Sequence, residues 1–319
     1  MSLAAEKAPQ TPTDPRRLGL LGWPVAHSLS PAMHNAALAA LGLPWTYELL
    51  PTPPADLAAA VRRLRTEGFI GANVTVPHKQ AVLALVDDLT PAARAMGAVN
   101  TLFWATPALQ GENKAIRTDD GPMVEYGEMR VSRLLGDNTD GSGFIADLLA
   151  HGVQVIGQQV LVIGGGGAAR AVVFALVAAG AAVTIVNRTL AHAETIAAIV
   201  TYHYPAASVS CARFPEALAP AAAGAGLIVN TTSVGMWPDE DAMPWDQALA
   251  LRPDQIVYDL VYRPRLTTFL RHAQVGGARV IDGLGMLVQQ GAAALTRWTG
   301  RPAPVAVMRA AAEAALAQH

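Results

Sequence analysis

A lysine ends the β-branched run GANVTVPHK, where its amine could transfer a proton. Only three of the chain's 23 basic residues are lysines, namely Lys7, Lys79 and Lys114, and the others are arginines. Arginine stabilises negative charge but does not release a proton near neutral pH, whereas lysine can. We therefore predict that Lys79 takes part in acid–base chemistry. The alternative is a solvated lysine at the start of a helix.

A glycine-rich loop in VLVIGGGGAARAVVFAL indicates nucleotide binding. An apolar strand precedes the loop, an amphipathic helix follows it, and Gly164, Gly166 and Ala169 satisfy the dinucleotide spacing. Glycines let the backbone approach a pyrophosphate, whose charge then lies at the N-terminus of the helix. The alternative is a glycine turn that serves packing alone.

The next predicted strand, AVTIV, bears on which dinucleotide is bound. Enzymes that use NAD usually place Asp or Glu at the end of this strand, where the carboxylate takes the ribose hydroxyls. Here the strand runs into Asn187, Arg188 and Thr189, with no carboxylate. An arginine can donate two hydrogen bonds to a 2′-phosphate, so we predict that the bound dinucleotide is NADP. A solvated arginine in a loop is the alternative.

The composition favours a soluble two-domain protein and disfavours several classes. The chain has 319 residues, 52% hydrophobic and 15% charged, which is enough for a sizeable core. A net charge of −2 and a pI near 6.4 argue against a nucleic-acid partner. The single cysteine, Cys211, cannot form an internal disulfide, which indicates a reducing compartment such as the cytoplasm.

Three further features have simple structural explanations. Residues 1–15 are rich in Pro and Ala and lack an apolar signal core, so we expect a loose N-terminus. The apolar span 160–186 contains four consecutive glycines and Arg170, which favours strand, loop, helix and strand over a membrane helix. His27, His34 and His78 have no carboxylate cluster at ligand spacing, so we expect no metal.

Alternating strand and helix patterns predict an α/β fold with a mostly parallel sheet. In the first part we expect Ser30 to be a helix N-cap, strands at 18–24, 46–50, 69–77 and 98–105, and helices at 30–42, 54–68, 79–86 and 91–97. A second block has a helix from about Ser142, strands near 161–163, 183–186, 227–231, 257–260 and 280–281, and two C-terminal helices. Residues 107–135 lack a sustained period and form either a mobile loop or a β-excursion.

Nine short motifs together resemble a known family. They occur in the order GWPVAHSLSPAMHN, NVTVPHK, GAVNT, DNTDG, IGGGGAA, NRT, NTTSVGM, YDLVYRP and DGLGMLVQQG. Each motif alone is weak, but the series closely resembles the shikimate dehydrogenase family from Leu18 to about Trp298.

The resemblance implies two domains and a reaction. The expected fold is an N-terminal α/β substrate domain, residues 16–139 plus 287–319, with a Rossmann-type doubly wound NADP-binding domain inserted at 140–286. The implied reaction is the NADP-dependent, reversible reduction of 3-dehydroshikimate to shikimate in aromatic amino-acid biosynthesis, by a cytoplasmic monomer or homodimer. Quinate or an aminoshikimate as the substrate, or a non-catalytic NADP-binding sensor, are the alternatives.

The resemblance also assigns residues. Lys79 and Asp140 would be the catalytic pair, although Asp140 could also serve as a helix N-terminal acid. The implied substrate-binding residues are Ser28, Ser30, Thr75, Asn100, Tyr262 and Gln290. The implied cofactor-binding residues are Gly164, Gly165, Gly166, Gly167, Ala168, Asn187, Arg188, Thr189, Met236 and Gly283. One departure from the family pattern is His192, at a position that is often basic.

Overall fold

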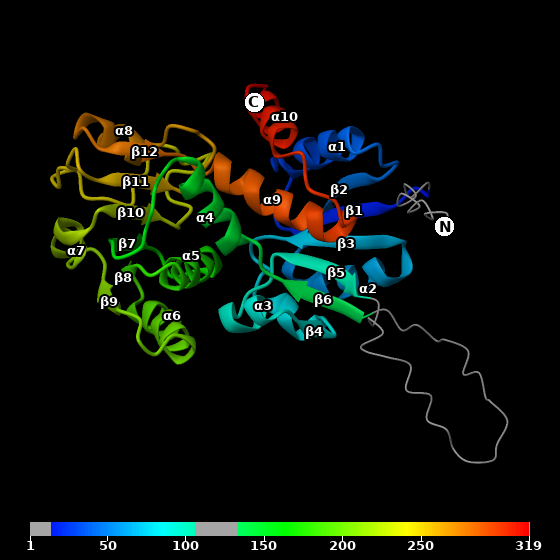
Figure 1. The fold of residues 1–319 in the computed structure, drawn as a ribbon, viewed down its shortest axis with the longest axis horizontal. Coiled ribbons are helices and arrows are strands. Elements are labelled where there is room, and N and C mark those ends of the chain that lie inside the picture. The colour runs from blue at the N-terminus through cyan, green and yellow to red at the C-terminus, as the bar shows by residue number, and fades with distance from the viewer. Residues whose placement is uncertain (1–13, 106–132, 319) are drawn as a thin grey trace, which may run out of the picture.

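Two β-sheets, each flanked by helices, form the two lobes of the molecule (Figure 1). The structure, a computed structural model, describes residues 14–105 and 133–318. Most of residues 107–135, which we predicted to form either a mobile loop or a β-excursion, lies outside the described residues. Most of the predicted loose N-terminus, residues 1–15, also lies outside them. Across the described ranges, every helix is too short or too polar to serve as a membrane span.

The N-terminal lobe is built on a six-stranded sheet in the order β2-β1-β3-β5-β6-β4. The strands are β1 (Arg17–Gly22), β2 (Thr46–Pro51), β3 (Phe69–Val74), β4 (Asp88–Leu89), β5 (Thr101–Ala105) and β6 (Arg133–Asp137). β1 pairs in parallel with β2 and β3, and β4 with β6, whereas β5 runs antiparallel to β3 and β6. β4 and β6 were not predicted, because β4 has two residues and β6 begins inside the segment without a period.

Helices from both ends of the chain cover this sheet. They are α1 (Ser30–Ala40), α2 (Leu57–Thr66), α3 (Pro91–Met96), α9 (Leu284–Thr299) and α10 (Val305–Leu316), with 3-10 turns η1 (Pro54–Asp56) and η2 (Ala81–Leu85). α2 buries Leu57, Val61 and Leu64 on one face, at the spacing of an amphipathic helix. Met33 of α1, Leu295 of α9 and Met308 of α10 share one buried core, so the C-terminal helices return to the N-terminal lobe.

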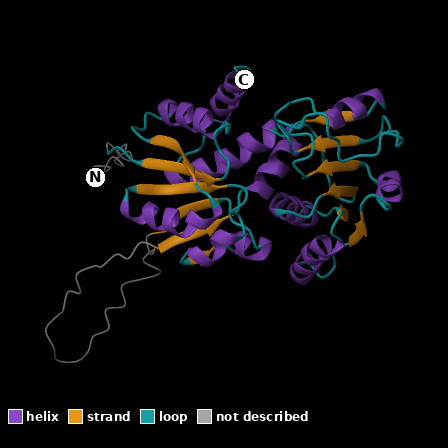
Figure 2. Ribbon diagram, turned by 180° about the vertical axis from the view of Figure 1, so that it is seen from behind, coloured by secondary structure: helices purple, strands orange, loops and turns teal. Residues whose placement is uncertain are grey.

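The second lobe is a doubly wound sheet in the order β12-β11-β10-β7-β8-β9, in which every pairing is parallel. Its strands are β7 (Gln159–Ile163), β8 (Ala182–Asn187), β9 (Val209–Arg213), β10 (Leu227–Asn230), β11 (Ile256–Asp259) and β12 (Arg279–Ile281). Its helices are α5 (Gly167–Ala178), α6 (Leu190–His203), α7 (Leu218–Gly224) and α8 (Thr268–Val275), which lie on both faces of the sheet (Figure 2). β9 was not predicted. The strand order reverses at β7, which is where such sheets bind ligands.

Two helices join the lobes. α4 (Asp140–Ala150) leads from β6 into the second lobe, and α9 returns from β12 to the first. They pack directly on each other between the two sheets (Figure 1). A β-carbon at Gly143 of α4 would lie 2.6 Å from the backbone N of Gln290 in α9, so the crossing requires glycine.

Two local predictions were wrong. Ser30 is not the N-cap of α1, because Leu29 holds that position and no side chain caps the helix there. Instead, the Ser30 backbone N–H donates to Ser28 Oγ at 3.2 Å, so Ser28 also contributes to the local structure before the helix. The helix predicted at 79–86 is only the 3-10 turn η2, and Lys79 precedes it in a loop.

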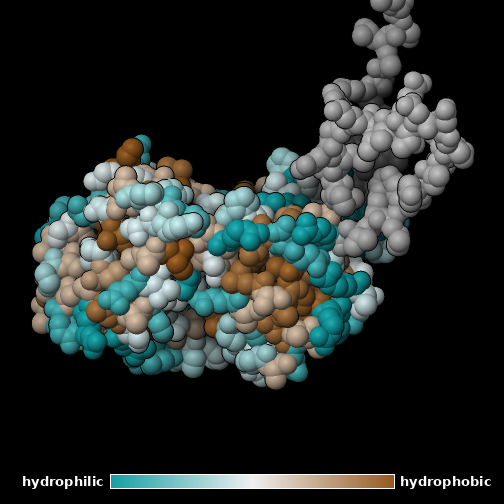
Figure 3. Space-filling view, turned by 90° about the horizontal axis from the view of Figure 1, so that it is seen from below, coloured by the Kyte–Doolittle hydropathy of each residue, from teal (hydrophilic) through white to brown (hydrophobic). Residues whose placement is uncertain are grey.

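The surface differs between the two lobes. Seen from below in space-filling form (Figure 3), hydrophobic residues gather on the N-terminal lobe inside a rim of hydrophilic ones. The second lobe shows a more even mixture on this face.

Candidate active site

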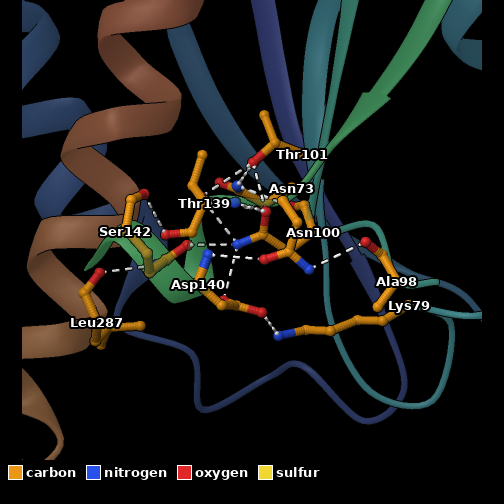
Figure 4. A network of polar contacts seen from close by, with 11 residues as sticks. Asn73, Lys79, Ala98, Asn100, Thr101, Thr139, Asp140, Ser142 and Leu287 are labelled. Atoms are coloured by element: carbon orange, nitrogen blue, oxygen red, sulfur yellow. Dashed lines mark hydrogen bonds and ion pairs between the residues drawn. The ribbon is translucent and has the colours of Figure 1, made fainter. Parts of the chain in front are cut away.

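Lys79 and Asp140 form an ion pair where the two lobes meet. Lys79 Nζ lies 2.6 Å from Asp140 Oδ2, and their side chains are 18% and 6% exposed (Figure 4). Lys79 comes from the loop after β3, and its backbone carbonyl accepts from Val99 N at 2.7 Å. Asp140 is the first residue of α4, where the helix dipole favours an acid. Both interpretations of Asp140, catalytic partner and helix-terminal acid, therefore fit its position.

The loop that carries Lys79 is pinned by a buried histidine. His78 Nε2 lies 2.6 Å from the carbonyl of Thr52, and His78 N donates to the Thr75 carbonyl at 2.8 Å. His78 is 1% exposed and faces the protein interior. The turn therefore presents Lys79 in a fixed place at the carboxyl end of β3.

Asn100 is the centre of a buried polar network around Asp140. Its Nδ2 group donates to Asp140 Oδ1 at 2.8 Å, and lies 3.0 Å from Thr139 Oγ1 and 3.2 Å from Gln290 Oε1 (Figure 4). Its Oδ1 accepts from Thr139 N at 2.8 Å. The network therefore joins the loop before β5, the start of α4 and the middle of α9.

Asn73 and Thr139 belong to this network, and sequence reasoning missed both. Asn73 Nδ2 donates to the Asn100 carbonyl at 3.1 Å, and Asn73 Oδ1 accepts from Tyr47 Oη at 2.8 Å. Asn73 and Thr139 are each 5% exposed. For Asn73 the available signal was a polar residue inside an otherwise apolar strand, since buried polar groups need partners. Thr139 precedes α4, where no such strand pattern exists.

The other predicted substrate residues follow β3 or stand at the start of α1, except for Tyr262, which comes from the second lobe. Ser28 and Ser30 stand at the start of α1, and Thr75 follows β3, with its N donating to the Leu21 carbonyl at 2.9 Å. A β-carbon at Gly22, at the end of β1, would lie 2.3 Å from Thr75 Cγ2, so the ends of β1 and β3 are in contact. Tyr262 packs against the N-terminal core from the second lobe, and burial raises the pKa of its phenol.

The glycine loop has the form that a pyrophosphate needs. Gly164 has φ of +123°, a conformation that favours glycine, and Gly166 is the N-cap of α5 with no side-chain cap. A β-carbon at Gly166 would meet nothing within 4 Å, so the backbone is open to a ligand there. The first-turn N–H groups of α5 are therefore available to an anion. Ala168 lies in this same turn.

This loop also approaches Lys79 across the lobe boundary. A β-carbon at Gly167 would lie 3.7 Å from Lys79 Cδ. The loop that fits a dinucleotide and the amine that could transfer a proton are thus adjacent in space, although they lie far apart in the sequence.

Of the remaining predicted cofactor residues, Asn187 lies beside the glycine loop. Asn187 ends β8, and its Nδ2 donates to the Thr189 carbonyl at 2.9 Å, while Arg188 and Thr189 are exposed. A β-carbon at Gly165 would lie 2.8 Å from Asn187 Nδ2 and 3.0 Å from His192 Cβ.

Met236 and Gly283 complete this set. Met236, in the loop after β10, is 45% exposed. Gly283 is the N-cap of α9, where a β-carbon would lie 2.0 Å from the Leu260 carbonyl. Gly283 is therefore required by backbone packing whether or not it contacts a cofactor.

Fold and site together define a two-domain α/β protein of the doubly wound, dinucleotide-binding class. The family profile described as "Shikimate dehydrogenase substrate binding domain" matches residues 20–102. "Shikimate / quinate 5-dehydrogenase" matches residues 147–223, and "Shikimate 5'-dehydrogenase C-terminal domain" matches residues 283–313.

The comparisons with individual proteins agree. The "Shikimate dehydrogenase (NADP(+))" of Symbiobacterium thermophilum is 44% identical over 94% of this chain and 95% of its own length. The Thermus thermophilus shikimate 5-dehydrogenase, solved with NADP(H) and shikimate, has a TM-score of 0.76 and 39% identity, and the match covers 94% of this chain and 99% of that one. Quinate dehydrogenase from Corynebacterium glutamicum, in complex with NAD, has a TM-score of 0.79 and 28% identity, with coverage of 93% and 99%. The chain belongs to the shikimate dehydrogenase family.

Proposed function

We propose that this protein is an NADP-dependent oxidoreductase that interconverts 3-dehydroshikimate and shikimate. The observation that carries the proposal is the Lys79–Asp140 pair, 2.6 Å between Nζ and Oδ2, beside the glycine loop of the second lobe. The similarity to relatives named shikimate dehydrogenase (NADP(+)) supports it.

In the proposed reaction, Lys79 handles the proton. As the ring ketone of 3-dehydroshikimate is reduced, negative charge grows on its oxygen, and the Lys79 ammonium gives that oxygen a proton. In the reverse direction the neutral amine takes the hydroxyl proton. Asp140 holds Nζ in place from one side, and Asn100 fixes Asp140 through Oδ1. Asp140 is therefore the orienting partner, or shares the proton with Lys79.

The cofactor would lie along the second sheet at β7, where the strand order reverses. Gly164 to Gly167 and Ala168 would hold the pyrophosphate, and Met236 and Gly283 would flank the nicotinamide end. Asn187, Arg188 and Thr189 would hold the adenosine ribose and its 2′-phosphate, since no carboxylate follows β8. When bound, the nicotinamide supplies or accepts the hydride.

The substrate would occupy the N-terminal lobe. Ser28 and Ser30 would bind its carboxylate, while Thr75, Asn100, Gln290 and Tyr262 would contact the ring hydroxyls. We propose residues 16–139 and 287–319 as the substrate domain, residues 140–286 as the cofactor domain, and a monomer or homodimer in the cytoplasm. Two elements that span both units, α4 and α9, support a boundary near their ends.

Absorbance at the reduced-nicotinamide band tests the proposal. Purified protein is mixed with shikimate or quinate, and with NADP⁺ or NAD⁺, and the four initial rates are compared. The proposal expects the highest kcat/KM with shikimate and NADP⁺. A highest value with quinate and NAD⁺ would favour the quinate alternative, which the similarity to the quinate dehydrogenase motivates. Binding of NADP⁺ without turnover of any substrate at any pH would favour a sensor.

A further inference from the structure

An aromatic contact bridges the two lobes outside the catalytic network. His27, in the loop between β1 and α1, meets Trp237, in the loop between β10 and β11. Their ring centroids lie 4.6 Å apart with an interplanar angle of 61°, an edge-to-face geometry. Such geometry is attractive for aromatic rings beyond the area that it buries.

Trp237 is fixed on its own lobe by Arg263. The guanidinium carbon of Arg263 lies 5.0 Å from the centroid of the Trp237 ring, and Trp237 N donates to the Arg263 carbonyl at 3.0 Å. Arg263 Nη1 is buried and has no hydrogen-bond partner among the described residues. A guanidinium that is partly removed from water interacts more strongly with an aromatic face. The indole therefore contacts both Arg263 of its own lobe and His27 of the N-terminal lobe.

Each member of this trio is next in sequence to a proposed ligand-binding residue. His27 precedes Ser28, Trp237 follows Met236, and Arg263 follows Tyr262. The contact therefore lies where the substrate loop of one lobe faces the cofactor and substrate loops of the other. Trp237 is also 40% exposed, so the contact can separate without opening a cavity in a core.

We propose that His27 and Trp237 form a closing contact that holds the two lobes together over bound shikimate, with Arg263 as the support for Trp237. This inference rests on the proposed function and names two positioning residues for it. The contact joins the lobes at their loops, whereas α4 and α9 join them through the chain. The contact between His27 and Trp237 should therefore stabilise the complex of the protein with NADP⁺ and shikimate, and contribute nothing to the binding of NADP⁺ alone.

A double-mutant cycle tests the contact. The variants are His27→Ala, Trp237→Ala and the double variant, and the measured quantities are KM and kcat for shikimate at saturating NADP⁺. We expect each single change to raise KM about three- to tenfold, and the double variant to be no worse than the more affected single. Trp237→Phe should restore most of the loss, because it keeps an aromatic ring. The dissociation constant of NADP⁺ in the absence of shikimate should stay the same.

A matched control exists on α6. Tyr202 and His203 make an edge-to-face contact with centroids 5.2 Å apart at 87°, but within a single helix. Tyr202→Ala and His203→Ala should leave KM for shikimate unchanged. Additive losses at His27 and Trp237, unchanged KM in both single variants, or an equal loss of NADP⁺ affinity would refute the closing contact.

A second measurement separates this inference from the proposed function. Shikimate is titrated into the NADP⁺ complex, and the tryptophan fluorescence of the wild type is compared with that of Trp237→Phe. We expect a shikimate-dependent change in the wild type that is absent from the variant, and the same change in both would refute the contact. A protein that binds shikimate without turnover would refute the proposed function alone, because the titration still measures the contact.

Discussion

The carboxylate of Asp147 on α4 lies directly against the backbone of Gly285 on α9. A β-carbon at Gly285 would be 1.8 Å from Asp147 Oδ1, and Tyr258 Oη donates to Asp147 Oδ2 at 2.7 Å. α4 begins with Asp140 and α9 carries Gln290, so this close approach fixes the spacing of the helices that supply two residues of the site.

Gly285→Ala should therefore destabilise the fold. The added methyl group overlaps a buried carboxylate on a neighbouring helix, which costs about 1–3 kcal/mol and exceeds the gain of roughly 1 kcal/mol in helix propensity. Thermal unfolding should show a lower Tm. Gly224→Ala is the control, because a β-carbon at Gly224 of α7 meets nothing within 4 Å. An equal or higher Tm for Gly285→Ala would mean that α4 and α9 can move apart freely.

Lys79→Arg should fail to replace the amine. Arginine preserves the charge opposite Asp140 but does not release a proton near neutral pH. We expect kcat to fall about 10²- to 10⁴-fold in both Lys79→Arg and Lys79→Met. NADP⁺ titration of both variants should give the wild-type dissociation constant. If Lys79→Arg kept kcat within about tenfold of the wild type, positive charge alone would suffice and proton transfer would belong to another group.

Arg188→Ala should weaken NADP⁺ binding selectively. A charge-assisted contact to a phosphate contributes about 1.5–3 kcal/mol, which corresponds to roughly a ten- to hundredfold rise in the dissociation constant. The affinity for NAD⁺, which lacks the 2′-phosphate, should change little. Arg252→Ala controls for net charge, since Arg252 is paired with Asp254 elsewhere on the surface. A parallel loss of affinity for both nucleotides would place Arg188 away from the 2′-phosphate.

His192→Lys should shift preference further toward NADP⁺. The Cβ of His192 lies near the glycine loop, 3.0 Å from a β-carbon built at Gly165, so a lysine there can reach the same region as Arg188. A permanent positive charge adds attraction for a phosphate. The ratio of the NAD⁺ and NADP⁺ dissociation constants, measured at one ionic strength, should rise. An unchanged ratio would show that this position does not face the 2′-phosphate.

Asp259→Asn should change the pH dependence of stability. Burial raises the pKa of Asp259 from 3.8 to about 6, although Thr267, Val261 and Asn230 donate hydrogen bonds to it. Because the pKa of Asp259 is higher in the folded state, the contribution of this carboxyl group to stability is complete below pH 3.8. That contribution is lost as the pH rises through about 6. The loss approaches about 2–3 kcal/mol.

The change from aspartate to asparagine removes that charge while retaining an amide oxygen as acceptor. The Tm of Asp259→Asn minus the Tm of the wild type should therefore be larger at about pH 7.5 than at about pH 5. Differential scanning fluorimetry at the two pH values measures this difference. Identical differences at both values would show that Asp259 does not become charged in this range.

Much of the site could be predicted from local sequence, but the hydrogen bonds that connect its residues could not. The position of Lys79 after a strand and the glycine loop between strand and helix follow from short-range sequence patterns. Asn73 and Thr139 were missed because their partners are far away in the chain: Asn73 bonds to Asn100 and Thr101, and Thr139 to Asn100. No local periodicity indicates such pairs. The N-cap of α1 was misassigned for a local reason, since the helix begins at Ser30 and Leu29 holds the N-cap position without a side-chain cap.

The sequence by itself determined the alternation of strands and helices, the glycine loop, the absence of a carboxylate after β8, and the choice of lysine at position 79. These depend on backbone propensities and on residue chemistry, which are local. Only the tertiary structure decided that Lys79 meets Asp140, that Gly167 lies beside that lysine, and that His27 touches Trp237. Those contacts arise from how two sheets pack around α4 and α9, and long-range packing is not encoded in any single segment.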